Sequence, residues 1–281
     1  VDTTAPTGGS VVDGTGADQD WNDGTLSSLS ANWSGFDASV SGLNKYEYAI
    51  RRSSDDYYWN AGGSSWQSGG SWVDNSVNTS VTANSLLLNT GETYYYSVKA
   101  TDNAGNISDI VSSDGQRVSP TLLFSFTSGA TITFNDLNAG NNWTDDSKST
   151  TLKTSTNAYG GYIIKVRAID ELRHLSNPVY AISHYGSGNS DPTTWSGTGF
   201  GYTTSDSSLS GGVSDRFTNS GPKYAGFSNT VFAPIADHTA NIVGSPVTDE
   251  EFTVGYKVVG DELKAAGTYR TTVLYTCIPQ Y

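Results

Sequence analysis

The chain has 281 residues, of which 15 are basic and 28 acidic, so its formal net charge at pH 7 is −13. This balance argues against nucleic acids and anionic membrane surfaces as partners, because both favour clusters of lysine and arginine. No apolar run is long enough to span a bilayer, and the abundance of glycine, tyrosine, serine and threonine favours an all-β protein.

The start of the chain indicates a secreted protein. The first residue is Val1 and no methionine occurs, so we expect that a secretion signal has been removed and that the protein is extracellular, at the cell surface. Cys277 has no partner for an internal disulfide. We expect it to act as a small buried hydrophobic residue, with an intermolecular disulfide as the alternative. Sequons for N-glycosylation begin at Asn32, Asn78, Asn106 and Asn142.

The length suits two domains, and Ser119-Pro120 marks the predicted boundary between residues 1–119 and 120–281. In the first domain, alternating segments predict strands over 29–36, 46–51 and 94–100. Trp33 is a candidate core residue of the first of these strands. Short strands separated by Gly- and Asn-rich turns are typical of a β-sandwich.

The order of motifs in this domain resembles a known family. The segments NWSGF, YEYAI and TYYYSVKATDNAGNIS are similar to the fibronectin type III-like domains of bacterial surface proteins. The resemblance covers residues 1–119 and implies a spacer or adhesive module without catalytic chemistry.

An acidic loop early in the first domain is a candidate metal site. The segment VVDGTGADQDWNDG places four aspartates at short spacing, where their oxygens could gather around Ca²⁺. The register of an EF-hand loop is missing, and the alternative is a solvated acidic loop. The candidate ligands are Asp13, Asp18, Asp20 and Asp23.

An aromatic stretch over residues 57–72 is a candidate contact surface. Flat rings diluted by glycine and serine could stack on sugars or on a neighbouring subunit, because they provide a large area at low entropic cost. The alternative is a long hairpin whose aromatic side chains pack onto the sandwich. The residues concerned are Tyr57, Tyr58, Trp59, Trp66 and Trp72.

The second domain is predicted to contain a further set of strands. The segment LLFSFTSGATITFNDLNAG begins at Leu122, and Ile132 and Phe134 alternate within it. The segment GYIIKVRA places Tyr162, Ile164 and Val166 on one face. Residues 172–250 are rich in Gly, Ser, Asn and Pro, and are predicted to form mainly long loops, which are often functional or ordered by a partner. Other strands are expected over 149–156, 199–204, 251–259 and 269–278.

This half resembles the C-terminal β-sandwich of secreted bacterial surface proteins related to WxL domains. The resemblance rests on SGATITFNDLNAG, TSTNAYGGYIIKV, YAGFSNT and FTVGYKVV, which leads into AGTYRTTVLYTCIPQY. None of the tryptophans is followed by leucine at the second position, so the Trp-x-Leu signature is missing. The sequence therefore lacks the motif that is associated with the wall-binding activity of that family.

Signs of catalysis are missing from the sequence. It contains no Gly-x-Ser-x-Gly elbow, no His-Glu-x-x-His motif and no phosphate-binding glycine loop. Asp170, Glu171 and His174 lie close together, but such a group is more often a solvated turn than a metal site. We therefore expect a protein that is not an enzyme and has no cofactor other than a possible Ca²⁺.

The terminal segment Gly267–Tyr281 is rich in β-branched and aromatic residues and must pair with another strand. It either closes its own domain or completes a neighbouring subunit. The strand model places Tyr269, Val273, Tyr275 and Cys277 on one face and Leu274 and Ile278 on the other, and the predicted strand also includes Thr271.

These features predict an all-β fold of two tandem β-sandwich domains, fibronectin type III-like followed by WxL-like. The predicted function is a secreted structural subunit of a bacterial filament or surface layer that assembles with copies of itself by non-covalent contacts, such as strand complementation. The alternative is an adhesin that binds the cell wall or a surface glycan.

Overall fold

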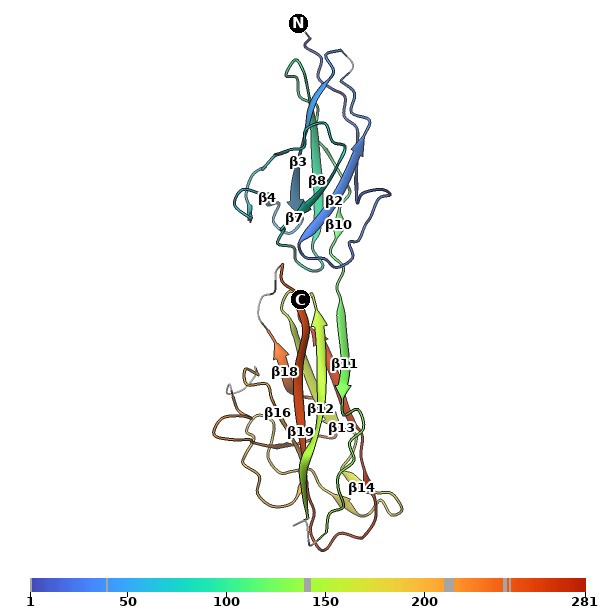
Figure 1. Cartoon of the computed structure of the whole chain (residues 1–281), viewed down its shortest axis with the longest axis vertical. Coiled ribbons are helices and arrows are strands. Elements are labelled where there is room, and N and C mark those ends of the chain that lie inside the picture. The colour runs from blue at the N-terminus through green and yellow to red at the C-terminus, as the bar shows by residue number, and fades with distance from the viewer. Residues whose placement is uncertain (1, 39, 139–142, 210–214, 240–241, 243) are drawn as a thin grey trace.

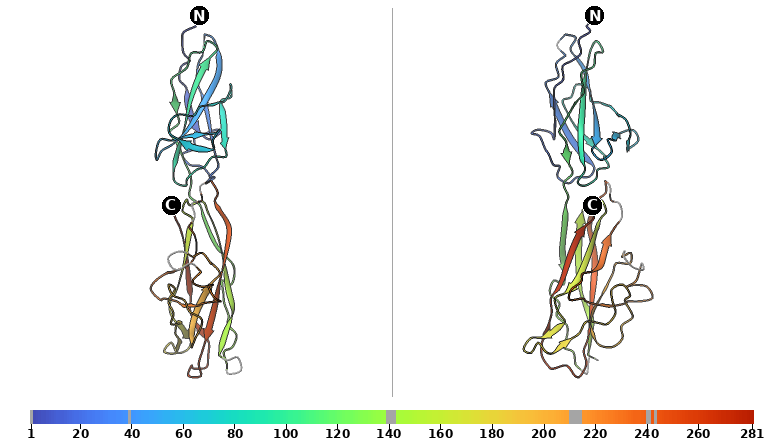
Figure 2. Two further views of the ribbon diagram at one scale, coloured as in Figure 1. Left: turned by 90° about the vertical axis from the view of Figure 1, so that its left-hand side faces the viewer. Right: turned by 180° about the vertical axis from the view of Figure 1, so that it is seen from behind.

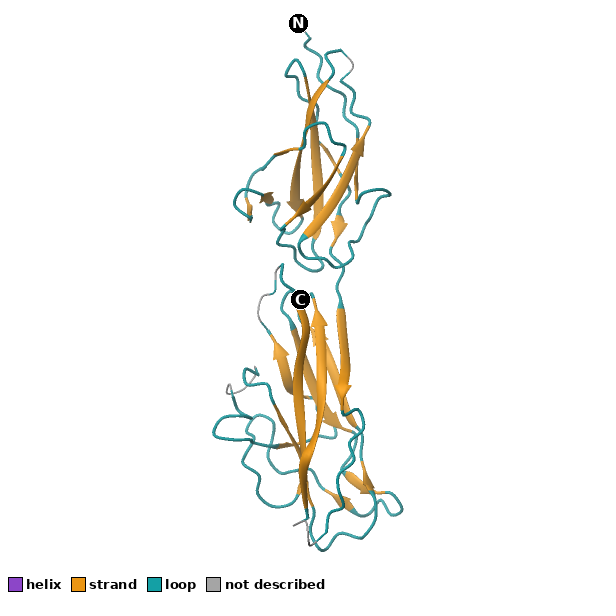
Figure 3. Ribbon diagram, viewed as in Figure 1, coloured by secondary structure: helices purple, strands orange, loops and turns teal. Residues whose placement is uncertain are grey.

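The computed structural model describes residues 2–38, 40–138, 143–209, 215–239, 242 and 244–281. Within these ranges the regular structure consists of β-strands and no helix occurs (Figure 3). The described residues accordingly include no helix that could cross a membrane. The predicted all-β fold is confirmed.

The first domain is built from two antiparallel sheets. One has three strands in the order β1-β2-β7, namely Ser10–Asp13, Ser28–Ser34 and Ser80–Asn84. The other has the order β10-β8-β3-β4-β5, namely Gln116–Arg117, Thr93–Asp102, Leu43–Arg52, Tyr58–Asn60 and Ser65–Gln67. Two short strands complete it: β6 (Val73–Asp74) pairs with β3, and β9 (Val111–Ser112) pairs with β8.

The core of this domain follows from alternation along the strands. In β2, every second residue from Leu29 to Trp33 is buried, because successive side chains of a strand point to opposite faces. In β8, Tyr94 and Tyr96 are buried in the same way. The Tyr96 hydroxyl donates a hydrogen bond of 2.8 Å to the Leu29 carbonyl and so links the two sheets. The predicted core position of Trp33 is confirmed.

The second domain also has two main sheets. The first has the order β11-β12-β19-β16-β17, with strands Leu122–Ser128, Thr144–Thr156, Val247–Val259, Gly199–Thr204 and Ala225–Gly226. The second has the order β18-β13-β21, with strands Ala233–His238, Tyr162–Ala168 and Val273–Pro279. A small sheet, β15-β14-β20, contains Ala181–Ile182, Leu172–His174 and Tyr269–Arg270.

A separate hydrophobic core fills the second domain. The predicted face of Tyr162, Ile164 and Val166 is buried in it. As expected, residues 172–250 are mainly loops with a strand at 199–204; the stretch also contributes the short strands β14, β15, β17 and β18, which were not predicted, and the buried side chains of Leu209 and Phe217. Such long-range packing leaves no periodic signal in the sequence.

The two domains lie end to end (Figures 1 and 2). Asn157, which follows β12, connects them: its side-chain nitrogen donates to the carbonyls of Gly24 and Ser119, both at 2.8 Å. Its side-chain oxygen accepts a 2.8 Å hydrogen bond from the backbone of Thr121. The N-terminus lies at the free end of the first domain, whereas the C-terminus lies at the junction (Figure 1).

Candidate functional sites

The terminal strand pairs within its own domain. β21 runs antiparallel to β13, from the pair Ala168↔Val273 to the pair Tyr162↔Pro279. Of the two arrangements expected from the sequence, this is the one in which the strand closes its own sheet. Tyr269 lies in β20 and not in β21, because the strand is interrupted after Arg270. At the interruption, the Thr271 hydroxyl donates a 2.6 Å hydrogen bond to the Asp170 carbonyl. The predicted continuous strand from 269 to 278 was therefore wrong.

One face of β21 packs against the core. Val273, Tyr275 and Cys277 contact the buried residues of the second domain, as the predicted alternation requires. The Tyr275 hydroxyl makes a hydrogen bond with that of Tyr256, and burial raises the pKa of Tyr275 well above its usual value. Burial also raises the pKa of the Cys277 thiol to about 11, against a smaller opposite effect of Thr154.

The outer edge of β21 is open within the described part of the chain. β21 and β11 each end their sheet. The backbone hydrogen bonds of Thr272 and Gln280 point toward β13: the Thr272 carbonyl accepts from the Ile169 amide, and the Gln280 amide donates to the Gly161 carbonyl. Because this direction alternates along an antiparallel strand, the N–H groups of Val273, Tyr275 and Cys277 face outward. Such an edge is a template for pairing with another chain.

The edges of β11 and β21 meet at one side of the sandwich, here called the open seam. Phe126 of β11 reaches across to Tyr275 of β21, with ring centroids 5.6 Å apart in an edge-to-face contact. Phe126 nevertheless remains 45% exposed, and Leu123, on the opposite face of β11, is 72% exposed. On β21, Ile278 is 38% exposed. The seam therefore presents apolar side chains beside unpaired backbone groups.

The aromatic residues over 57–72 do not form one exposed face. Trp59 is only 5% exposed, and Trp66 packs on it and on Tyr94 with centroid distances of 5.3 and 5.2 Å. The Trp66 indole nitrogen donates to the Leu87 carbonyl at 2.7 Å. The Lys99 amine lies over the Trp72 ring, 4.4 Å from its centroid.

The β4–β5 hairpin thus packs its indoles onto the sandwich, which was the alternative expected from the sequence. Of the predicted surface, Tyr57 is exposed, and Tyr58 and Trp72 are partly exposed. A contact role for these three residues stays a prediction.

The structure brings two of the four predicted Ca²⁺ ligands together and adds another. One ligand oxygen from each of Asp13, Asp18 and Asp114 lies within 4.8 Å of the others. This group is called the acidic cluster below. Asp23 instead accepts hydrogen bonds from Thr25, and Asp20 lies outside the cluster. Asp114 was missed because it lies about a hundred positions along the chain, and only the fold brings it to Asp13.

Asp13 is the buried member of the acidic cluster. It is 0% exposed, whereas Asp18 and Asp114 lie at the surface. Its Oδ2 accepts a 3.0 Å hydrogen bond from the Gly115 amide, and its Oδ1 is buried without a hydrogen-bond partner among the described residues. Burial raises the pKa of Asp13 to about 6, although Ser113 and Gly115 act in the opposite direction.

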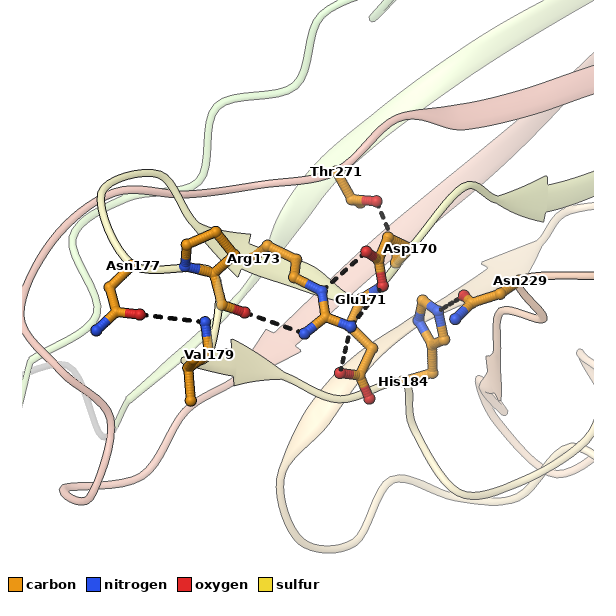
Figure 4. Close-up of polar contacts among 9 residues, drawn as sticks. Asp170, Glu171, Arg173, Asn177, Val179, His184, Asn229 and Thr271 are labelled. Carbon is orange, nitrogen blue, oxygen red and sulfur yellow. Dashed lines mark hydrogen bonds and ion pairs between the residues drawn. The ribbon is translucent and has the colours of Figure 1, made fainter.

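The polar group near β14 is a structural turn (Figure 4). Arg173 forms two hydrogen bonds with the Asp170 carboxylate, at 2.8 and 2.9 Å, and a 3.8 Å ion pair with Glu171. Its guanidinium also donates a 3.1 Å hydrogen bond to the Pro178 carbonyl. His174 instead accepts hydrogen bonds from the backbone of Ser176 and Asn177. These contacts hold the β14 hairpin and match the solvated turn expected from the sequence.

The comparisons with known proteins do not assign a family. No family model and no curated protein matches this sequence. Among solved structures, the twitchin kinase region from C. elegans is 16% identical and matches 41% of this chain with a TM-score of 0.27. The chain spans only 17% of the length of that structure.

Two other solved structures match over most of the chain. The chicken CNTN1 FN1-FN3 domains are 11% identical over 96% of this chain and 66% of that one, with a TM-score of 0.29. The alpha-L-rhamnosidase from Dictyoglumus thermophilum is 7% identical over 99% of this chain and 28% of that one, with a TM-score of 0.28. At such scores these similarities carry no argument about function.

Proposed function

We propose that this chain is a non-catalytic structural subunit of an extracellular bacterial filament or surface layer, in which copies join by strand addition at the open seam. The observation that carries the proposal is Phe126, which reaches across the seam to Tyr275 and still remains 45% exposed. A strand added there would cover this ring and pair with the outward backbone groups of β21.

The physical basis is β-augmentation. Main-chain hydrogen bonds supply affinity when an extended segment joins a sheet edge, and alternate side chains set the register. In this seam, Leu123 and Ile278 provide exposed apolar contacts beside the edges. A contact between different surfaces of successive copies propagates as a filament, and two domains placed end to end suit such an arrangement.

The alternative, a cell-wall or glycan-binding adhesin, has less support. Sugar stacking needs open ring faces, but Trp59 and Trp66 are used for packing and Trp72 lies beneath Lys99. Near β14, Arg173 and the carboxylates of Asp170 and Glu171 are paired with one another, which is consistent with the non-catalytic role proposed here.

The proposal is tested by introducing charge at the seam. We expect the native protein to form regular fibres in negative-stain electron microscopy, and the double variant Leu123→Lys/Ile278→Lys to remain monomeric in size-exclusion chromatography. Charged side chains on an edge oppose strand addition, whereas neither Leu123 nor Ile278 belongs to the hydrophobic core of the second domain.

The matched control is the double variant Val179→Lys/Leu263→Lys, which places the same charge at two apolar residues outside the seam that are each 85% exposed. This control should form fibres like the native protein. Fibres from the double variant would refute the seam as the contact surface. A native protein that stays monomeric at all concentrations would refute self-assembly itself.

A further inference from the structure

The acidic cluster contains a buried oxygen without a partner. The Oδ1 atom of Asp13 is sealed from solvent and accepts no hydrogen bond from the described residues, while the carboxylates of Asp18 and Asp114 lie close by. An unpaired buried polar atom is costly, and neighbouring like charges add to that cost. A bound cation would remove both costs.

We propose that the acidic cluster binds one divalent cation and that Ca²⁺ is preferred. All three side chains offer hard carboxylate oxygens, and no histidine or cysteine joins them within the described residues. Oxygen-only sites favour Ca²⁺ and Mg²⁺ over zinc. Ca²⁺ tolerates irregular geometry, whereas Mg²⁺ requires a nearly ideal octahedron. Two of the ligands are exposed, so water can complete the coordination.

The loop after β1 folds back on itself, so that the side chain of Asp18 lies next to Asp13. Gly14 adopts a φ of 87°, a left-handed conformation that turns the chain sharply. The Asp13 amide then donates to Asp18 Oδ1 at 3.0 Å. The Asn32 side chain donates to the carbonyls of Gly14 and Gly16, at 2.9 and 3.1 Å, and holds the loop from outside. The loop is therefore fixed around the carboxylates.

The cation would connect the two sheets of the first domain. Asp13 ends β1 in one sheet, whereas Asp114 lies between β9 and β10 of the other. Beyond the cluster the same two segments continue side by side: Trp21 and Arg117 form a parallel bridge. The Ser119 amide then donates to the Asn22 side chain at 3.1 Å. A cation bound at the acidic cluster would thus stabilise the two segments that lead to the domain junction.

The experiment is a titration of the chelator-treated monomer with CaCl₂, followed by isothermal titration calorimetry, thermal melting and hydrogen exchange. We expect one Ca²⁺ per chain and slower exchange in residues 14–24. A free Ca²⁺ concentration of 100 times Kd should raise the melting temperature of the first domain by roughly 8 °C or more. Mg²⁺ should bind at least about tenfold more weakly.

The decisive variants are Asp114→Asn and Asp18→Asn, which remove one negative charge each at exposed positions and should fold. Each should lower Ca²⁺ affinity at least about tenfold, because carboxylate charge sets the affinity of such sites. Asp109→Asn is the control, since it removes the same charge from an exposed residue outside the cluster. No binding up to about 10 mM Ca²⁺, or an equal effect of the control, would overturn the proposal.

Discussion

At the scale of single residues, Cys277 shows how burial determines the behaviour of a side chain. It lies on the core face of β21, where burial raises the pKa of its thiol to about 11. The thiolate is the reactive form, so at pH 8 we expect folded Cys277 to react with a thiol reagent on the order of 100 times more slowly than a free cysteine, whose pKa is about 8.5. Release of thionitrobenzoate from Ellman's reagent measures this rate.

The control for Cys277 is the same chain in denaturant, where the reaction should be fast. Because the pKa is raised in the folded state, the unfolded thiol ionises first. The contribution of this group to stability is therefore lost as the pH rises from about 9 to 11. Equal rates in the folded and unfolded chains would contradict the burial of the thiol.

At the scale of elements, β21 is an integral strand of the second domain that also presents a free edge. Deletion of residues 276–281 removes the partners of β13 from Tyr162 to Lys165 and takes Cys277 out of the core. We expect this truncation to unfold the second domain or lower its melting temperature by roughly 10 °C or more, while the first domain retains its own transition. Calorimetry resolves the two transitions, and an unchanged second transition would contradict the observed pairing.

At the scale of the whole molecule, Asn157 contributes polar contacts to the junction between the domains. Its side chain makes hydrogen bonds to Gly24, Ser119 and Thr121, and interfaces between domains of one chain commonly permit relative motion. We expect Asn157→Ala to loosen the junction without unfolding either core, and small-angle X-ray scattering should show a broader distribution of domain distances. Asn84→Ala, at an exposed position with only a local contact, should scatter like the native protein. Identical scattering of Asn157→Ala would show that Asn157 does not hold the domains.

Local patterns in the sequence were sufficient for several of the longer strands. Alternation of apolar residues predicted β2, β3, β8 and β13 and the burial of Trp33 and Ile164. The reason is that in a strand with one buried face, every second residue is apolar. The same reasoning grouped Val273, Tyr275 and Cys277 on one face of β21, but only the structure showed that this face meets the core.

Contacts between distant segments were decided by the tertiary structure alone. The pairing of β21 with β13, the burial of Trp59 and the approach of Asp114 to Asp13 join residues far apart in the chain. A strand that closes its own sheet and one donated to a neighbour have the same alternation, since both need one buried face and one paired edge. Likewise, four aspartates at short spacing indicate an acidic loop, and only folding selects which of their oxygens meet.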